Sequence, residues 1–460
     1  MPHASTIAAL ATARGSSGIG IIRLSGPQSW AIASQLIQGQ PPLADHRANL
    51  RSIVDPTTGE LLDQGIILPM RGPHSYTGED TVELQLHGSP LLLDSVLRGC
   101  MHLGAVPARP GEFTFRALLA GKLTLLQAEA VRDLIDAGSE VELSMARHAL
   151  FHDTSQPFRS VLEKVTRAAA YLEAPMDFPD QFTAEDEADA AEAARALVVQ
   201  ARQEMVPLSN DAMASAHARH GVTVVIAGSP NVGKSSLMNA LLHYPRVIVS
   251  ELPGTTRDTV SETISMRGYR VTLVDTAGIG ETPQDALDHL AGDRTRDALE
   301  RADIILLVLD ATAGIRGHEQ DLIARLDGIP HLVAVNKVDA GPIPDDILHA
   351  LHALPDETVF GISATEGTEI DRLTGALALL VEQASGGAAT RQLVTERQAA
   401  ELAAADARLS DFLAAPAAIP MDERAEMLSE AREALLRLLG EHISPEDLLS
   451  TVFSTFCIGK

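Results

Sequence analysis

The segment GSPNVGKS, residues 228–235, has the composition and spacing of a phosphate-binding loop. It follows the β-branched run VTVVIA and precedes the helical pattern SSLMNALL, so strand, loop and helix occur in the required order. Glycines would let the backbone N–H groups surround a β-phosphate, and the helix N-terminus would add positive potential. Lys234 would neutralise charge on the β- and γ-phosphates, and the Ser235 hydroxyl would bind Mg²⁺. The segment therefore predicts a nucleoside triphosphate site.

Two motifs downstream extend this site toward the γ-phosphate. The sequence DTAG, residues 275–278, ends the predicted strand VTLV, which would place Asp275 to hold Mg²⁺ through water and the Gly278 amide to meet the γ-phosphate. Between it and the first motif lies GTTRD, residues 254–258, in which Thr256 would complete the Mg²⁺ shell. This second stretch is the expected switch segment.

The base is predicted by the motif NKVD, residues 336–339, at the end of the strand pattern HLVAV. Asp339 could accept two hydrogen bonds from the N1–H and amino group of guanine, which adenine cannot offer. Lys337 would pack over the base, and backbone amides of SAT, residues 363–365, would contact the guanine oxygen. Together and in this order, the motifs predict a site for GTP rather than ATP.

The predicted GTP-binding residues all lie in or beside these motifs. They are Asn231, Val232, Gly233, Lys234, Ser235, Ser236, Ser250, Glu251, Leu252, Pro253, Gly254, Thr255, Thr256, Asp275, Thr276, Ala277, Gly278, Asn336, Lys337, Asp339, Ser363, Ala364 and Thr365, with Ser235 and Thr256 as the Mg²⁺ ligands. Ile279 follows DTAG, where Ras-like proteins place the glutamine that orients the attacking water. Hydrolysis must therefore be organised differently.

Length and composition bound the remaining possibilities. A chain of 460 residues suggests about three domains. We expect a cytoplasmic protein without a membrane segment, because no apolar run approaches the ~20 residues of a bilayer span and Cys100 and Cys457 are the only cysteines. The formal net charge of −26 disfavours tight direct binding to a polyanion, so a nucleic-acid substrate would need basic surface from another subunit.

The hydrophobic patterning predicts an α/β domain inserted into a helical one. In TVELQLH, residues 81–87, alternation would point Val82, Leu84 and Leu86 to the core and Glu83 to the opposite face. The expected domains are an N-terminal α+β domain at 1–121, a helical domain in two halves at 122–216 and 385–460, and a P-loop domain with a doubly wound parallel sheet at 217–384.

Further segments carry a resemblance to a known family. Together with the GTP motifs and Ile279, they are GIGIIRLSG, YTGEDTVELQLHG, RPGEFTFRALLAGKLTLLQAEAVRDLI, MDFPD and the terminal FCIGK. The chain resembles the MnmE (TrmE) family of tRNA-modification GTPases over essentially its whole length. The resemblance implies a Ras-like GTPase domain, a folate-binding N-terminal domain and a homodimer formed through the N-terminal domains.

The resemblance also implies how GTP is hydrolysed. A potassium ion would stand in for an arginine finger when two GTPase domains meet, with Asn231, Ser250, Leu252 and Thr255 as its ligands. The family places a water-orienting glutamate downstream of DTAG. The matching catalytic position here is Asp288, although a one-residue length difference makes Asp285 a rival, and an aspartate is one methylene shorter than the glutamate.

The family's one-carbon chemistry maps onto the two ends of the chain. A tetrahydrofolate derivative would bind at Arg23, Glu83, Lys122 and Lys460, where Glu83 can accept hydrogen bonds from the pterin and the cations can meet the glutamate tail. With the FAD-using partner MnmG (GidA), the family adds an aminomethyl or carboxymethylaminomethyl group to carbon 5 of the wobble uridine of certain tRNAs.

Two alternatives stay open at this stage. A ribosome-assembly GTPase switch would bind GTP without one-carbon chemistry, although the sequence shows no basic RNA-binding module. The terminal CIGK places Cys457 where a prenylation signal would, but Gly459 and Lys460 match that signal poorly. A tail docked at the folate site, with Gly459 allowing close backbone approach, fits better, and Cys457 would then act either in the chemistry or in packing.

Overall fold

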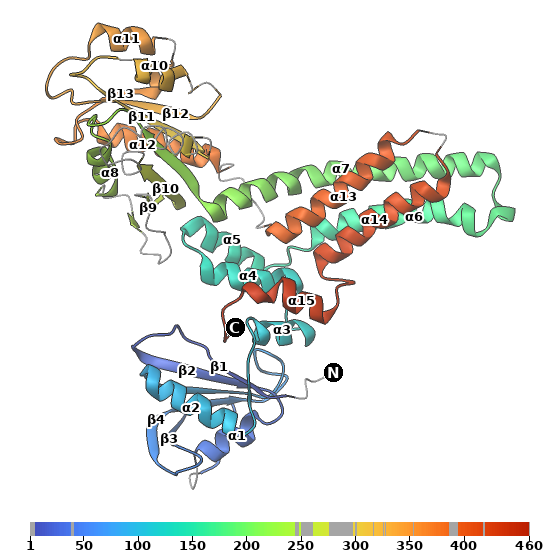
Figure 1. Cartoon of the computed structure of the whole chain (residues 1–460). Coiled ribbons are helices and arrows are strands. Elements are labelled where there is room, and N and C mark those ends of the chain that lie inside the picture. The colour runs from blue at the N-terminus through green and yellow to red at the C-terminus, as the bar shows by residue number, and fades with distance from the viewer. Residues whose placement is uncertain are drawn as a thin grey trace, which may run out of the picture. The chain divides into compact units, whose positions relative to one another are not determined.

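The structure is a computed structural model, and it divides the chain into two compact units (Figure 1). The first unit comprises Met1–Arg132, Leu150–Ala201 and Ala404–Lys460, and the second comprises Asp133–Ala149 and Arg202–Ala403. The residues that the structure describes are 5–37, 41–243, 248–249, 261–275, 298–299, 301–315, 317–324, 326, 328–352, 354–385, 394–416 and 419–459.

The first unit contains a six-stranded sheet in the order β3-β4-β5-β2-β1-β6. Its strands are β1 (Ile7–Leu10), β2 (Ser17–Ser25), β3 (Asn49–Val54), β4 (Leu61–Met70), β5 (Thr81–Gly88) and β6 (Val106–Pro107). All neighbours are antiparallel except β1 and β6. Helices α1 (Ser29–Leu36) and α2 (Pro90–His102) pack on one face, where Val82, Leu84 and Leu86 are buried as the alternation predicts.

The opposite face of this sheet carries polar side chains at the same strands. Arg23 and Glu83 are direct cross-strand partners on β2 and β5, and Leu68 of β4 stands opposite Glu83 on the other side. The period of two that buries Leu84 therefore brings the Glu83 carboxylate and the Arg23 guanidinium together on the face opposite α1 and α2.

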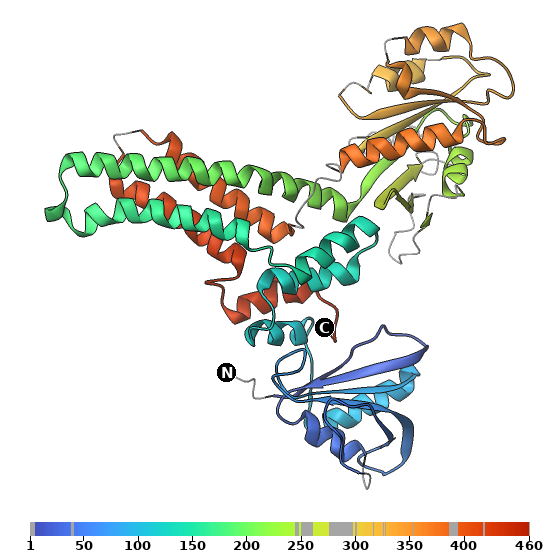
Figure 2. The ribbon, with the colours of Figure 1, turned by 180° about the vertical axis from the view of Figure 1, so that it is seen from behind.

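Helices make up the rest of the first unit. They are α3 (Glu112–Leu119), α4 (Leu125–Asp136), α6 (Gln156–Asp177), α7 (Ala184–His220), α13 (Glu396–Ala414), α14 (Met421–Leu439) and α15 (Pro445–Thr451), with single 3₁₀ turns at Pro179–Gln181 and Phe453–Thr455. The N-terminal part of α7 and the C-terminal part of α13 belong to this unit. Helix α14 packs along α6 (Figure 2). Arg195 of α7 donates to the Leu413 carbonyl of α13 at 2.8 Å.

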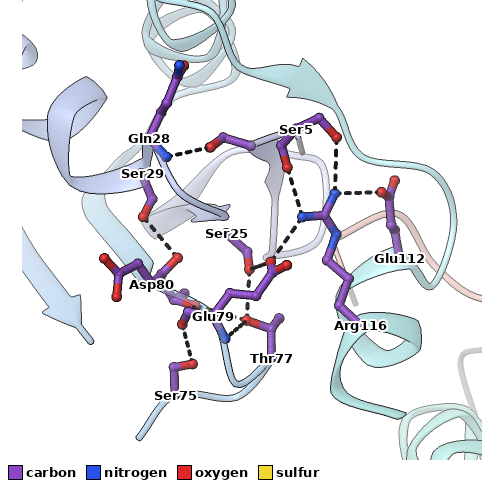
Figure 3. Close-up of polar contacts among 12 residues, drawn as sticks. Ser5, Ser25, Gln28, Ser29, Ser75, Thr77, Glu79, Asp80, Glu112 and Arg116 are labelled. Carbon is purple, nitrogen blue, oxygen red and sulfur yellow. Dashed lines mark hydrogen bonds and ion pairs between the residues drawn. The ribbon is translucent and has the colours of Figure 1, made fainter. Parts of the chain in front are cut away.

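A buried arginine holds the loop before β5 against α3 (Figure 3). The Arg116 guanidinium is 1% exposed and donates to Glu79 Oε2 at 3.0 Å and to Glu112 Oε1 at 2.9 Å. Its Nη1 also donates to the Ser5 carbonyl at 2.9 Å, and Glu79 accepts from the Ser25 hydroxyl at 2.8 Å. Two carboxylates and one backbone oxygen thus accept from Nη1 and Nη2 of a charge that would be costly to bury alone, while Nε has no acceptor among the described residues.

The second unit contains a seven-stranded sheet in the order β13-β12-β11-β7-β10-β9-β8. Its strands are β7 (Val222–Ala227), β8 (Ile248–Val249), β9 (Ser261–Met266), β10 (Tyr269–Asp275), β11 (Ile304–Asp310), β12 (His331–Asn336) and β13 (Val359–Ile362). The five strands from β13 to β10 are parallel, and β9 and β8 continue the sheet antiparallel. Every residue of β11 is buried, as expected of a central strand covered on both faces.

Helices cover both faces of this sheet. They are α8 (Lys234–Leu242), α10 (Gly317–Ala324), α11 (Asp345–Leu351) and α12 (Ile370–Ala384), with a 3₁₀ turn at Asp356–Thr358. One core contains residues of α8 and α12, and the other contains residues of α10 and α11. The predicted fold class, a doubly wound P-loop domain beside a helical and an N-terminal α+β domain, is confirmed.

The segment 133–149 packs with the second unit. Glu142 of α5 (Glu140–Phe151) forms an ion pair with Arg270 of β10 at 3.1 Å, and it also accepts from the Gly138 amide at 2.9 Å. The Val141 amide donates to the Gly268 carbonyl at the tip of the β9–β10 hairpin, at 3.1 Å. A Cβ at Gly138 would lie 2.0 Å from Arg270 Nη2, so a larger residue there would displace the guanidinium from its present position.

We expect Arg116→Met to destabilise the first unit locally by about 3 kcal/mol, because it leaves two carboxylates buried without their partner. Hydrogen exchange of the amides of β1, β2 and β5 in the full chain would measure the loss. The matched control is Arg109→Met, since the Arg109 side chain is 64% exposed and its Nε lies 3.7 Å from Glu112, while the backbone amide that binds Glu112 is kept. That change should cost at most about 1 kcal/mol, and equal losses in the two variants would contradict the prediction.

Candidate functional site

The phosphate-binding loop lies between β7 and α8, and its backbone conformation depends on glycine. Gly233, at φ 98°, precedes the first residue of α8. Beside it, the buried side chain of Asn336 donates from Nδ2 to the Val232 carbonyl at 2.9 Å. A Cβ at position 233 would lie 2.2 Å from that nitrogen. The loop can therefore close against β12 only if residue 233 is glycine.

Asn336 also connects the phosphate loop to the predicted base loop. Its Oδ1 accepts from the Ala364 amide at 3.0 Å. Ser363 is completely buried, and its hydroxyl lies 3.2 Å from that of Thr365. One amide side chain thus binds two loops that are far apart in the sequence, and both loops belong to the predicted GTP site.

Lys234 is folded into the phosphate loop. Its Nζ donates to the carbonyls of Gly228 at 2.8 Å and Ser229 at 2.9 Å. Burial lowers the pKa of the Lys234 ammonium below its ordinary value, and the nearby Asp275 carboxylate opposes that shift. The loop carbonyls therefore hold a cation at the N-terminus of α8, where phosphate oxygens would be bound.

The predicted Mg²⁺ residues lie together. The Ser235 hydroxyl donates to Asp275 Oδ2 at 2.8 Å, and Asp275 is 2% exposed at the end of β10. A hydroxyl and a carboxylate at a helix N-terminus are the oxygen ligands that Mg²⁺ takes next to a nucleotide. These two residues fit the metal, whereas Thr256 lies outside the described residues.

Lys337 follows β12 and turns back toward the phosphate loop. Its φ of 69° lies in the left-handed region, and its Nζ donates to the Asn231 carbonyl at 2.9 Å and to Asp310 Oδ2 at 2.6 Å. Asp339, the predicted guanine acceptor, is exposed. The structure thus brings residues of the motifs at 228–235, 336–339 and 363–365 to one edge of the sheet.

Two acidic residues at this edge were not predicted from the sequence. Asp310 ends β11 beside Asn336 and binds Lys337, and Glu319 of α10 is 5% exposed and accepts a hydrogen bond from the Ser229 hydroxyl. Asp310 had a signal, since it ends a continuous apolar strand at the carboxyl edge of the sheet where ligands bind. Glu319 had none.

Several predicted site residues lie outside the described residues. They are Ser250, Glu251, Leu252, Pro253, Gly254, Thr255, Thr256, Thr276, Ala277, Gly278, Asp285, Asp288 and Lys460. They include the catalytic candidates, three of the four potassium ligands and one folate residue.

A second candidate site lies in the first unit around Arg23. Its guanidinium bonds Glu83 Oε1 through Nε at 3.0 Å and Nη2 at 2.9 Å, and both side chains are about one-sixth exposed. The same guanidinium lies 5.7 Å from the Tyr76 ring centroid and 5.6 Å from that of Phe113. Burial raises the pKa of the Tyr76 phenol, so this ring stays neutral. Lys122 is exposed. It lies beside Gly78, which belongs to the same loop as Tyr76.

The C-terminal tail reaches this site. Arg23 Nη1 donates to the Gly459 carbonyl at 3.3 Å, and the Gly111 amide donates to the Cys457 carbonyl at 3.4 Å. Gly459 has φ 97°, and a Cβ there would lie 2.2 Å from the Leu10 carbonyl. The thiol-bearing residue Cys457 is exposed. An aromatic cluster anchors the tail upstream, with ring centroids of Phe453 and Phe456 4.9 Å apart.

The fold and the first site define a P-loop GTPase. Residues 6–122 match the family described as the GTP-binding protein TrmE N-terminus, and residues 125–457 match the MnmE helical domain. The chain belongs to the MnmE family of tRNA modification GTPases, and it is a GTP hydrolase that acts in tRNA modification.

Individual relatives align along the whole chain. The tRNA modification GTPase MnmE of Thiobacillus denitrificans is 38% identical over 462 residues, covering 100% of this chain and 99% of the relative. Those of Laribacter hongkongensis and Burkholderia ambifaria are 37% and 39% identical, each over 99% of this chain and 99% and 98% of their own lengths. Among the described residues, none of the helices has the length and apolar character needed to cross a bilayer.

We expect Gly233→Ala to weaken GTP binding at least about tenfold, because the new methyl group would displace Asn336 and open the phosphate loop. Equilibrium titration with a fluorescent GTP analogue would measure this. The matched control is Gly328→Ala, since Gly328 also has positive φ, 77°, but no atom lies within 4 Å of its added Cβ. If the two variants lose the same affinity, backbone strain rather than the Asn336 contact is responsible.

Proposed function

We propose that this GTPase, with an FAD-dependent partner, takes part in the folate-dependent addition of an aminomethyl or carboxymethylaminomethyl group to carbon 5 of the wobble uridine of certain tRNAs. The observation that carries this proposal is the Arg23–Glu83 pair with the tail carbonyl of Gly459 bound to it. This second polar site is separate in sequence from the GTP motifs and contains none of the predicted GTP-binding residues. The family assignment supports tRNA modification over the alternative of a ribosome-assembly switch.

The residues of the second site suit a tetrahydrofolate derivative. Glu83 offers a carboxylate that can accept from adjacent pterin N–H groups, and Tyr76 and Phe113 offer ring faces next to it. Arg23 and the exposed Lys122 supply positive charge for an anionic glutamate tail, and Lys460, one residue beyond Gly459, is proposed as a third cation. Bound folate supplies the one-carbon unit, while these side chains bind and orient it.

Cys457 is proposed as the residue nearest the chemistry in the tail. Cys457 is exposed, and its backbone carbonyl accepts a hydrogen bond from the Gly111 amide. The backbone is therefore held in place while the side chain is accessible. Cys100, by contrast, is buried in α2, and burial raises the pKa of its thiol to about 12. Of the two cysteines, only Cys457 can react.

At the GTP site, each described residue has a defined task. Lys234 and the α8 N-terminus bind the β- and γ-phosphates, and Ser235 with Asp275 would hold Mg²⁺, which supplies positive charge to the phosphate oxygens when bound. Lys337 and Asp339 bind guanine. We propose Thr256 as a further metal ligand and Asp288, or its rival Asp285, as the residue that orients the attacking water.

A homodimer is supported by exposed apolar side chains on the face of the first unit's sheet that lies opposite α1 and α2. Leu50 is 61% exposed and Ile66 is 38% exposed, and the two are cross-strand partners on β3 and β4. Ile66 stands opposite Gln85, which shares the face of Glu83. Apolar area of this kind beside a binding site suits a second copy of the chain. Light scattering of the full chain should give twice its mass of 48.8 kDa.

The proposed partner and compartment follow from charge and chemistry. The net charge of −26 leaves tRNA contacts mainly to the partner, which we propose is the flavoprotein MnmG (GidA) acting in the cytoplasm. That partner would supply the redox step with FAD, which no residue described in this chain provides.

We expect Gly459→Ala to abolish tRNA modification while GTP hydrolysis stays normal, because the methyl group cannot fit against the Leu10 carbonyl and the tail must leave Arg23. Nucleoside analysis of tRNA from cells whose only copy is the variant would show unmodified wobble uridine. The matched control is Gly59→Ala in the β3–β4 turn, at φ 73° with no atom within 4 Å of its added Cβ.

Folate binding by the purified chain tests the Arg23–Glu83 site directly, whereas the Gly459→Ala variant tests the C-terminal tail. Arg23→Ala should lose a folate complex that the wild-type chain forms. The absence of folate binding by the wild-type chain, or full modification by the Gly459→Ala variant, would refute the proposed function.

GTP hydrolysis should be at least about tenfold faster in potassium chloride than in sodium chloride, since a correctly sized cation would offset charge on the leaving phosphate. Asn231, the one proposed ligand among the described residues, is exposed at the phosphate loop. Asn231→Ala should remove most of the difference between the salts. Equal rates of the wild-type chain in both salts would eliminate the cation's role, and with it the four proposed ligands Asn231, Ser250, Leu252 and Thr255.

A further inference from the structure

Asp310 is a buried acid at the GTP site that none of the nucleotide motifs contains. It ends β11, and its Cα partner across the parallel ladder is Asn336, the last residue of β12. Ligands of doubly wound sheets bind outside the carboxyl ends of the strands, which is where Asp310 lies. Its side chain is only 10% exposed. A buried carboxylate at this edge needs a physical reason for its presence.

The two oxygens of Asp310 have different partners. Oδ1 accepts from the Thr312 amide at 2.8 Å and from the Thr312 hydroxyl at 2.7 Å, which fixes the rotation of the carboxylate. Oδ2 accepts from Lys337 Nζ at 2.6 Å. Burial acts to raise the pKa of Asp310, but these hydrogen bonds outweigh it and hold the pKa below its ordinary value. Asp310 is therefore charged at neutral pH, and it is aimed at one lysine.

Lys337 is held at both ends of its side chain. Its backbone takes a left-handed conformation directly after β12, which lets the long stem turn back over the site. Its ammonium bonds Asp310 and the Asn231 carbonyl in the phosphate loop, and Asn231 itself has a positive φ of 65°. A lysine side chain has four rotatable bonds, so without Asp310 only one neutral acceptor among these contacts would restrain it.

We infer that Asp310 is a positioning residue of the GTP site that acts through Lys337. It fixes the aliphatic stem of Lys337 where the guanine ring packs, and through the shared ammonium it also holds the carbonyl of Asn231 and so the phosphate loop. The inference rests on the proposed assignment of Lys337 to the base. Both oxygens of Asp310 are bound by Thr312 and Lys337, so we assign it no direct contact with GTP and expect its effect on nucleotide affinity rather than on the hydrolysis step.

Nucleotide affinity and turnover of Asp310→Asn in the full chain test this inference. We expect Kd for GTP and GDP, and KM for GTP, to rise about tenfold, because asparagine is uncharged and has one acceptor oxygen where Thr312 and Lys337 require two. We expect kcat to change less than about twofold. Asp346→Asn is the matched control. Asp346 also accepts a backbone amide hydrogen bond, from Ile315 at 3.0 Å, but among the described residues Lys337 bonds to Asp310 and the Asn231 carbonyl and not to Asp346. Its variant should bind GTP normally.

A double-mutant cycle shows whether Asp310 acts through the lysine. Lys337→Met alone should weaken GTP binding, and adding Asp310→Asn should cause no further loss, since the partner of the carboxylate is already absent. Asp310→Glu keeps the charge but shifts it by one methylene, and it serves as a second variant if Asp310→Asn does not fold. It should weaken binding less than Asp310→Asn.

Two results would overturn the inference. One is a folded Asp310 variant with wild-type nucleotide affinity, and the other is a double variant whose loss equals the product of the two single losses. Normal affinity in Lys337→Met would overturn the base assignment together with the inference. None of these outcomes bears on wobble-uridine modification, so failure here and failure of the proposed function are distinguishable.

Discussion

The GTP site depends on the close approach of the Asn336 side chain to the backbone of the phosphate loop. The hydrogen bond from Nδ2 to the Val232 carbonyl is buried, so its loss would leave polar groups without water to replace it. The same amide accepts from Ala364, which ties the base loop to the phosphate loop. Only glycine at position 233 leaves room for this contact. The position of Lys234 and Ser235, at the start of α8, follows from it.

The first unit uses the same constraint at its candidate folate site. Gly459 lies so close to the Leu10 carbonyl that any side chain would collide, and this approach is what lets its own carbonyl reach Arg23. Gly233 and Gly459 both lack a Cβ where a side chain or backbone atom of a distant segment occupies that space. The absence of a side chain at one residue thus permits a contact between segments that are far apart in the chain.

Ion pairs with at least one largely buried partner also join distant segments. Arg116 with Glu79 and Glu112, Arg270 with Glu142, and Lys337 with Asp310 each join segments from different elements. Such pairs add little net stability over apolar packing, because desolvation offsets most of the attraction. They do, however, penalise any arrangement in which one partner is missing, so they specify which loop docks where. In this protein they hold the loop before β5, the N-terminus of α5 and the base-loop lysine.

The sequence by itself determined the order of the GTP motifs, the doubly wound sheet that carries them and the alternation that puts Glu83 opposite a buried face. These depend on local rules: a glycine-rich turn between strand and helix, a run of β-branched residues, and a period of two. The tertiary structure alone decided the partners. Asp310 lies 27 positions from Lys337, Glu142 lies 128 from Arg270, and Arg23 lies 436 from Gly459. No local pattern encodes such a contact, because its energy arises only when packing of the intervening elements brings the two groups together and removes them from water.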